Sequence, residues 1–308
     1  MSTHVIPDLE ILGLLGSGSF GYVFEAHDKN RNQKVALKRT TKAGDYVSRE
    51  YEILEILKGC PNCIQVLDIF YTKNEEDDKL AQNLVFEFCS DNLESMMTEI
   101  KTQKEIFSMD KVRHYSWQIL NGLKHMHERS VVHRDLKPEN VLVNDDDEVK
   151  ICDFGSSKVL DPNGKNTPYI VSRYYRAPEL ILGVSNYTEK IDIWAVGCII
   201  AELLMLKPIF PGKTEGSQFL EQMAILGTPT EEEYRQMAPN IPPTTKKLLD
   251  QIEHFKRKNI CDLIPSTYHE RDKKIIVDLI EKMLAWDPKE RITAGEALEH
   301  EFFTNEDQ

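Results

Sequence analysis

The fold of this chain is decided by residues 133–155, which read HRDLKPENVLVNDDDEVKICDFG. Two strand-like triplets, Val141–Val143 and Val149–Ile151, flank an acidic turn and predict a hairpin. A hairpin holds its two ends close together. We therefore expect Asp135, Asn140 and Asp153 to converge on one small volume, although they are well separated along the chain.

The three converging side chains suit a magnesium ion and a proton transfer. Asn140 and Asp153 offer the hard oxygen ligands that Mg²⁺ prefers, which leaves Asp135 to accept a proton from an incoming hydroxyl. Lys137 adds a positive charge where a phosphoryl group would travel. Residues 133–140, HRDLKPEN, match the catalytic loop of protein kinases, and residues 153–155, DFG, match their metal-binding triplet. With both motifs at this spacing, the chain resembles that family.

Bulk composition excludes several other classes of protein. A length of 308 residues with 41% hydrophobic and 29% charged residues is typical of a folded soluble protein with one large domain or two moderate ones. The net charge of −13 disfavours nucleic acid or an anionic membrane as a general partner. The N-terminus lacks a signal-peptide pattern, and six cysteines fit free thiols in a reducing compartment. We expect a cytoplasmic location, with the nucleus as a further one.

A glycine-rich string, G-x-G-x-x-G, occupies residues 16–21. A strand-like run follows it, which favours a flap over nucleotide phosphates; the dinucleotide-binding fold would need a helix there. In the next strand, alternation with period two puts Ala36 and Lys38 on one inward face. The alternative for Lys38 is an ordinary exposed strand lysine.

A helix is predicted over about Asp45 to Lys58, with Glu50 on its apolar stripe. A carboxylate on a packing face needs a partner. Lys38 would supply it, giving the lysine–glutamate pair with which kinases hold the α- and β-phosphates. The alternative is a glutamate at the edge of the stripe.

The resemblance implies an α+β, bilobal protein kinase fold over about residues 8–304, with ATP and Mg²⁺ as cofactors. A small β-rich lobe with one regulatory helix would take residues 1–89, and a larger, mainly helical lobe residues 90–308. Phe86 would be the gatekeeper beside adenine, which the backbones of Glu87 and Cys89 would hydrogen-bond. The expected ATP-binding residues are Gly16, Ser17, Gly18, Ser19, Phe20, Gly21, Val23, Ala36, Lys38, Phe86, Glu87 and Cys89, and the expected catalytic residues are Lys38, Glu50, Asp135 and Lys137.

Two long helices should support the catalytic loop. One is predicted between Asp110 and Arg129, and the other, between Ile191 and Leu206, is apolar on most faces and therefore buried. By resemblance, Asp192 hydrogen-bonds the catalytic loop. Arg291 matches the family arginine that pairs with Glu179.

Three patterns could suggest further metal sites. Cys60 and Cys63 have no second cysteine pair downstream to complete a zinc site. His125 and His127 are two positions apart, so their side chains diverge on a helix. The acidic turn at residues 145–147 lacks the glycine and the terminal glutamate of a calcium loop. We expect a loop at the end of the helix, histidines with structural or surface roles, and a solvated turn. Residues 71–82 read as a solvated loop between two strands.

Three basic residues indicate the subfamily. Arg49, Arg134 and Lys158 stand at the positions where glycogen synthase kinase-3 builds an anion pocket for a phosphate already on the substrate, four residues C-terminal to the target. The alternative is that Arg49 and Lys158 pair with local carboxylates. Lys137 is typical of serine/threonine kinases, and residues 172–176, SRYYR, are shared by cyclin-dependent, mitogen-activated and glycogen synthase kinases.

The activation segment, residues 153–179, leaves one choice open. Tyr169 matches the self-phosphorylated tyrosine of glycogen synthase kinase-3, but Thr167 and Tyr169 also fit the T-x-Y lip of mitogen-activated kinases, in which phosphothreonine fills the same pocket. The short spacing from Lys38 to Glu50 favours the first reading.

We therefore expect a serine/threonine kinase closest to glycogen synthase kinase-3, acting on primed protein substrates. The alternatives are a mitogen-activated-like kinase and a pseudokinase scaffold without turnover. The resemblance also implies a scaffold protein as a partner, although residues 242–273 diverge from the family. Neither nucleic acid nor a membrane is expected to bind.

Overall fold

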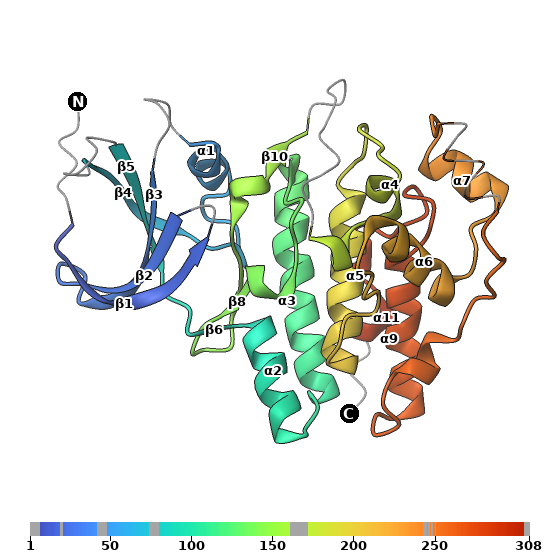
Figure 1. Ribbon diagram of the computed structural model, residues 1–308. Helices are drawn as coiled ribbons and strands as arrows, with labels where there is room; N and C mark the ends of the chain where they lie inside the picture. The colour runs from blue at the N-terminus through green and yellow to red at the C-terminus, as the bar shows by residue number, and fades with distance from the viewer. Residues whose placement is uncertain are drawn as a thin grey trace.

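The computed structural model describes residues 7–18, 21–41, 48–73, 80–160, 172–242, 245, 247, 249 and 251–304. It has two unequal parts (Figure 1), an antiparallel sheet with one helix up to Glu87 and a mainly helical part beyond it. This arrangement agrees with the expected α+β, bilobal class. Along the described residues, no helix combines the length and the apolar composition that a membrane crossing requires.

The first part is a five-stranded sheet in the order β1-β2-β3-β5-β4. Its elements are β1 Leu9–Gly18, β2 Gly21–Asp28, β3 Gln33–Thr41, α1 Arg49–Ile56, β4 Val66–Lys73 and β5 Leu80–Glu87. Val35 and Leu37 of β3 are buried in a small core with Val85. Ala36 and Lys38 alternate with them and share the opposite face, as the period-two pattern predicts.

The glycine-rich string covers the end of β1 and the start of β2. Gly18 pairs with Gly21, and β2 follows directly as a strand, which excludes the dinucleotide-binding alternative. Gly21 has φ +112°, and a Cβ there would lie 2.1 Å from the carbonyl oxygen of Arg39. No side chain fits this position, so glycine is required. Ser19 and Phe20 lie outside the described residues.

Helix α1 is shorter than predicted. It begins after Ser48, whose hydroxyl accepts a hydrogen bond from the Tyr51 amide, and ends at Ile56; residues 42–47 are not described. The loop expected at residues 71–82 is wrong at both ends, because β4 runs to Lys73 and β5 begins at Leu80; residues 74–79 are not described. Tyr71 pairs with Gln82 in this ladder, which extends the two strands into the polar sequence.

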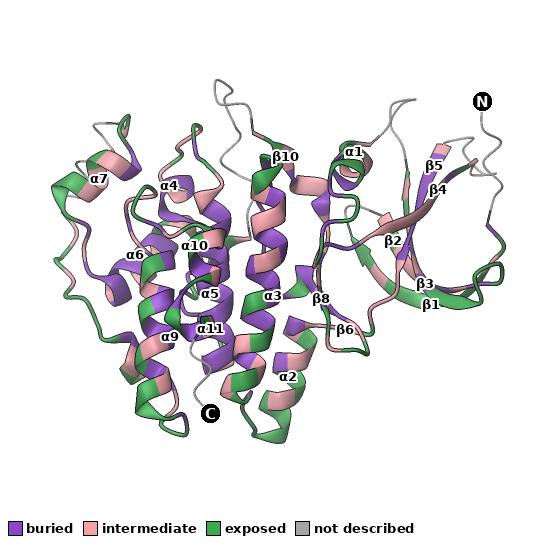
Figure 2. Ribbon diagram, turned by 180° about the vertical axis from the view of Figure 1, so that it is seen from behind, coloured by how far each residue is buried: buried purple, intermediate pink, exposed green. Residues whose placement is uncertain are grey.

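The second part packs around α5, which is buried along almost its whole length (Figure 2). Helices α3 and α5 lie within one residue of the predicted bounds at each end. The elements are β6 Asp91–Asn92, α2 Leu93–Gln103, α3 Met109–Glu128, β7 Val131–Val132, η1 Pro138–Asn140, β8 Val141–Val143, β9 Val149–Ile151, η2 Phe154–Ser156, β10 Lys158–Val159, η3 Arg173–Tyr175, α4 Pro178–Ile181, α5 Lys190–Met205, α6 Glu215–Leu226, α7 Glu231–Met237, η4 Ile260–Leu263, α9 Glu270–Met283, α10 Ala294–Leu298 and α11 Glu301–Thr304.

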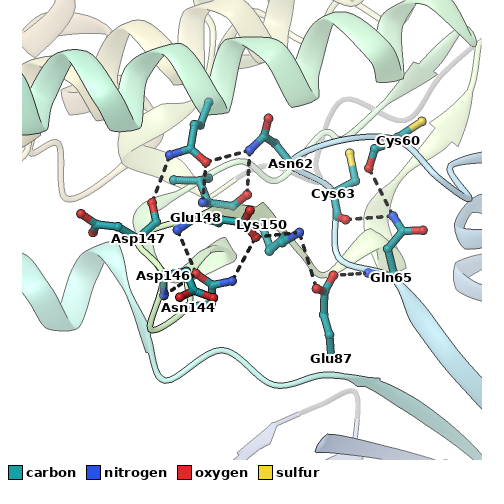
Figure 3. Close-up of polar contacts among 12 residues, drawn as sticks. Cys60, Asn62, Cys63, Gln65, Glu87, Asn144, Asp146, Asp147, Glu148 and Lys150 are labelled. Carbon is teal, nitrogen blue, oxygen red and sulfur yellow. Dashed lines mark hydrogen bonds and ion pairs between the residues drawn. The ribbon is translucent and has the colours of Figure 1, made fainter.

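A loop of the first part is hydrogen-bonded into the second. The Ile64 amide donates to the Ile151 carbonyl at 2.9 Å, and the Ile151 amide donates to the Asn62 carbonyl at 2.8 Å. The Asn62 amide group donates to Gln118 of α3 at 2.9 Å and to the Val149 carbonyl (Figure 3). The segment just after α1 therefore adds to the edge of β9, well before the predicted lobe boundary at residue 89.

A buried ion pair joins α4 to the distal end of the second part. Arg291 donates two hydrogen bonds to the Glu179 carboxylate, at 2.6 and 2.7 Å, and its guanidinium lies 5.0 Å from the centre of the Trp194 ring. Both charged side chains are almost fully buried. This is the pair that the resemblance implied.

We predict that Arg291→Met lowers the free energy of unfolding by about 3–5 kcal/mol, because it leaves the Glu179 carboxylate buried without a cation. Methionine keeps the apolar stem, so the loss reports the charge more than a cavity. Denaturant unfolding measures the change. Arg235→Met, at an exposed pair with Glu232, is the control and should change stability by less than about 0.5 kcal/mol. If adding Glu179→Gln to Arg291→Met restores no stability, the charge explanation is wrong.

Candidate active site

The hairpin of β8 and β9 brings the predicted site residues together. Val141 pairs with Ile151, and the Cys152 amide donates to the Asn140 carbonyl at 2.9 Å. Asn140 in turn donates from its side-chain amide to the Asp135 carbonyl at 2.8 Å. Asp135, Asn140 and Asp153 therefore lie on joined segments, as the sequence predicts.

The turn of this hairpin is fixed to α3 through Asp147. Its carboxylate pairs with Lys111 and accepts a hydrogen bond from the Tyr115 hydroxyl at 2.7 Å, and its carbonyl accepts from Gln118 at 3.1 Å. Hydrogen bonds from Lys111 and then Tyr115 hold the pKa of Asp147 below its ordinary value. The turn is solvated at Asp145 and Asp146, as predicted, but Asp147, which has a left-handed φ of 66°, also anchors the hairpin.

The carboxylate of Asp192, on α5, holds the backbone of the catalytic loop. Asp192, only 1% exposed, accepts hydrogen bonds from the His133 amide at 2.8 Å and the Arg134 amide at 2.9 Å. His127 lies 3.1 Å from the same carboxylate. Arg134 has φ +69°, a strained conformation for a residue with a side chain, and the bonds to Asp192 compensate this strain. The predicted role of Asp192 as a support of the loop is confirmed.

Lys38 joins the sheet, the helix and the hairpin. Its Nζ lies 2.7 Å from Oε1 of Glu50 on α1 and 3.2 Å from Oδ1 of Asp153. Burial acts to lower the pKa of Lys38, but the charges of Glu50 and Asp153 outweigh it and raise the pKa above the ordinary value. Lys38 is therefore a cation fixed between two carboxylates, and the alternative of an exposed strand lysine is wrong.

A cavity of about 790 Å³ opens between the sheet and the hairpin. Ten of the predicted ATP-binding residues line it, and Asn140, Glu50 and Asp153 border it as well. The ten residues are Gly16, Ser17, Gly18, Gly21, Val23, Ala36, Lys38, Phe86, Glu87 and Cys89. The remaining two, Ser19 and Phe20, are not described.

The sequence reasoning missed the apolar residues Leu15, Ile64 and Leu142, which also line this cavity. A signal for Leu142 exists, since Val141 and Val143 on either side are buried and alternation turns Leu142 to the opposite face. Ile64 carries no such signal, because its place depends on the loop that docks on β9.

Glu87 is held at the edge of the cavity. Its amide donates to the Gln65 carbonyl at 3.4 Å, and its carboxylate accepts from the Gln65 amide at 2.9 Å and lies 3.5 Å from Nζ of Lys150 (Figure 3). Because its N–H already has a partner, any contact of Glu87 with adenine would use its carbonyl.

The oxygens at the cavity fit a magnesium ion. The amide nitrogen of Asn140 is committed to Asp135, which leaves its Oδ1 as an acceptor, and Asp153 has a second carboxylate oxygen beside the one near Lys38. Within the described part of the chain, no three histidine, cysteine or acidic side chains form a metal site by themselves. Two protein oxygens are enough for Mg²⁺ at a nucleotide site, where the phosphates usually supply further ligands.

Asp135 is oriented by the activation segment. Its Oδ1 accepts hydrogen bonds from the Ser172 amide at 2.8 Å and the Ser172 hydroxyl at 2.9 Å. Among the described residues, none donates a hydrogen bond to the other carboxylate oxygen, the arrangement that a general base would need.

Comparison with known proteins identifies the family. Residues 9–303 match the protein kinase domain. The chain belongs to the protein kinase family. A Dictyostelium discoideum protein named "Probable serine/threonine-protein kinase glkA" is 39% identical over 293 residues, which cover 95% of this chain and 58% of that protein.

Two further relatives support the same placement. "Protein kinase gsk3" of Schizosaccharomyces pombe is 37% identical over 94% of this chain and 72% of its own length, and "Glycogen synthase kinase 1" of Pyricularia oryzae is 36% identical over 94% and 71%. These names place this kinase domain among the serine/threonine kinases similar to glycogen synthase kinases, as the motifs indicate.

The predicted phosphate-pocket residues lie on neighbouring segments of this kinase domain. Arg49 is exposed in the first turn of α1, which packs against η2, and Lys158 is on β10, paired with Val132. Arg134 is buried and donates from Nε to the Ser156 carbonyl of η2 at 2.6 Å. Thr167 and Tyr169 fall outside the described residues.

Cys60 and Cys63 are buried at the end of α1, in the loop that docks on β9. Burial raises the pKa of Cys63 to about 12, so its thiol is neutral at physiological pH. His125 lies beside Glu128 at the surface, and His127 lies beside the buried Asp192, in agreement with the surface or structural roles expected of them.

A second cavity, of about 480 Å³, is lined by Lys137 of the catalytic loop and by Ser172 of the activation segment. Its floor includes Glu202 of α5, which is 4% exposed and accepts a hydrogen bond from the Tyr175 hydroxyl at 2.8 Å. Burial, together with the charges of Glu94 and Glu139, raises the pKa of Glu202 to about 7, although the bond from Tyr175 and the charge of Lys101 act against it.

We predict that Asp153→Asn abolishes phosphoryl transfer, with a loss of at least about 10²–10³-fold in kcat, because the variant lacks the charge that would hold the metal ion. Steady-state assays with MgATP measure the loss. Asp145→Asn, in the exposed part of the hairpin turn, should keep the wild-type rate. Wild-type rates for Asp153→Asn with Mg²⁺ would show that the metal assignment is wrong.

We also predict a pH dependence of stability from Glu202. Its carboxyl titrates near 7 in the folded chain but near 4.5 when unfolded, so the folded state binds more protons between these values and stability falls as pH rises through them. Glu202→Gln, which can still accept from Tyr175, should gain about 2–3 kcal/mol relative to wild type between pH 5 and pH 8. Denaturant unfolding at both pH values tests this; Glu232→Gln, at an exposed site, is the control. Parallel pH profiles for wild type and Glu202→Gln would contradict it.

Proposed function

We propose that this chain transfers the γ-phosphoryl group of ATP, in the presence of Mg²⁺, to serine or threonine in protein substrates, and that it favours substrates already phosphorylated four residues C-terminal to the target. Lys38, fixed by Glu50, would bind the phosphates. Asp135 would orient the acceptor hydroxyl and take its proton. Bound Mg²⁺ would supply charge neutralisation at the phosphates. Catalysis would thus rest on positioning and on fixed charges.

The preference for primed substrates rests on Arg134. Its side chain is buried, and in the described part of the chain it bonds to two neutral oxygens, with no carboxylate as a partner. A buried cation without a counter-charge is costly, and a phosphate would supply that charge through strong, charge-assisted hydrogen bonds. Arg49, exposed on the neighbouring first turn of α1, would contribute from the other side.

The names of the relatives support this choice, since two of them are called glycogen synthase kinase or gsk3. The alternative is a mitogen-activated-like kinase, in which a phosphate on Thr167 of the chain itself would fill the same pocket. The two alternatives differ in the origin of the phosphate, the substrate or the enzyme.

We predict that a Ser-x-x-x-Ser peptide is a much better substrate when its second serine is phosphorylated, and that Arg49→Ala lowers kcat/KM for the primed peptide by about 10- to 100-fold. One charge-assisted hydrogen bond to phosphate, about 1.5–3 kcal/mol, sets this range. Initial rates with MgATP, on primed and unprimed peptides, measure it.

The control is Lys58→Ala, which removes the same charge from an exposed position just beyond α1. It should leave the preference intact. Equal rates on both peptides, with activity that rises only after Thr167 and Tyr169 are phosphorylated, would move the chain to the mitogen-activated alternative. If the wild-type chain transfers phosphate and Asp135→Asn does not, the pseudokinase alternative is wrong.

A further inference from the structure

A tyrosine distant in sequence holds the guanidinium of Arg134. Tyr187, in the segment between α4 and α5, is 6% exposed, and its hydroxyl accepts a hydrogen bond from Nη1 of Arg134 at 3.1 Å. The two residues are 53 positions apart. None of the kinase motifs in the sequence assigns a role to Tyr187.

Arg134 is held at two further points, one on its side chain and one on its backbone. Its Nε donates to the Ser156 carbonyl at 2.6 Å, and its own backbone amide is bound to Asp192. The guanidinium is planar and has five N–H donors. Two of these, one on Nε and one on Nη1, donate to neutral oxygens, which fixes the orientation of the plane without neutralising its charge.

This arrangement suits a ligand with several acceptor oxygens. A carboxylate at the position of Tyr187 would also hold the guanidinium but would compete with an incoming anion for its charge. A phenol hydroxyl holds the group and leaves the full positive charge available. Fixing a binding group before the ligand arrives reduces the entropy lost on binding.

We infer that Tyr187 is a positioning residue of the phosphate pocket, whose hydroxyl fixes the Arg134 guanidinium so that its remaining N–H groups receive the phosphoryl group of a primed substrate. This inference rests on the proposed function. It assigns Tyr187 a role in the recognition of primed substrates and none in the transfer step. The aromatic ring belongs to the hydrophobic core, so the hydroxyl alone must carry the effect.

The test is Tyr187→Phe, which keeps the ring and removes the hydroxyl. We expect KM for the primed peptide to rise about 3- to 10-fold, the range of one net hydrogen bond, with kcat unchanged and with unchanged kinetics on the unprimed peptide. Tyr268→Phe is the matched control. Tyr268 is also 6% exposed, and its hydroxyl donates to the Phe107 carbonyl in another region of the helical part. It should change neither KM.

A second measurement does not depend on the substrate. In protein labelled with ¹⁵N-arginine, assigned through Arg134→Lys, the Nη groups of Arg134 should rotate and exchange with solvent faster in Tyr187→Phe than in wild type or Tyr268→Phe. If these rates do not change, the hydroxyl does not hold the guanidinium, and the inference is overturned.

The two readouts separate the inference from the proposed function. If wild type prefers the primed peptide but Tyr187→Phe keeps the wild-type KM, the positioning role fails and the proposed function stands. If wild type shows no preference for the primed peptide while the Arg134 signals change as expected, the Tyr187 hydroxyl does hold the guanidinium but the proposed function fails. The role of Tyr187 in recognising primed substrates then fails with it. An equal fall in kcat on both peptides would mean a general structural effect and would also overturn the inference.

Discussion

The buried carboxylate of Asp192 is the constraint on which the active site depends. It lies in the first turn of α5, the most completely buried helix described, and it binds two consecutive amides of the catalytic loop. These bonds maintain the left-handed backbone at Arg134, a conformation that costs about 1–3 kcal/mol by itself. The direction of the Arg134 side chain, and that of Asp135 after it, follow from this backbone. The rigidity of the loop thus comes from a helix that takes no part in the chemistry.

The second constraint is electrostatic. One ammonium group, that of Lys38, lies between the carboxylates of Glu50 and Asp153, so this small volume has a net negative charge. A divalent cation would compensate that charge, and phosphates would in turn compensate the cation. Lys38, proposed to bind the nucleotide, and Asp153, proposed to bind the metal, therefore share one charge balance, assembled from the sheet, α1 and the hairpin.

Much of this site follows from sequence because its parts are local. The hairpin needs only a few residues between its strands, and alternation within β3 and the apolar character of α5 are short-range patterns. The contacts that were missed join distant segments without a periodic signal. Tyr187 reads as an ordinary core aromatic, and Asp147 reads as one of three solvated aspartates until α3 supplies Lys111 and Tyr115. Strand pairing likewise extended β4 and β5 into polar sequence, where tertiary context prevailed over composition.

The loop at Asn62 and Ile64 has a consequence for how the molecule unfolds. Because this loop is hydrogen-bonded to β9 and α3, its amides should share the protection from hydrogen exchange of the helical part rather than that of the sheet that follows it in sequence. The boundary between cooperative units then lies at residues 59–65, ahead of the connection near Ser90. Local opening of the sheet would leave this loop in place, with the C-terminal end of α1 still tethered to the larger unit.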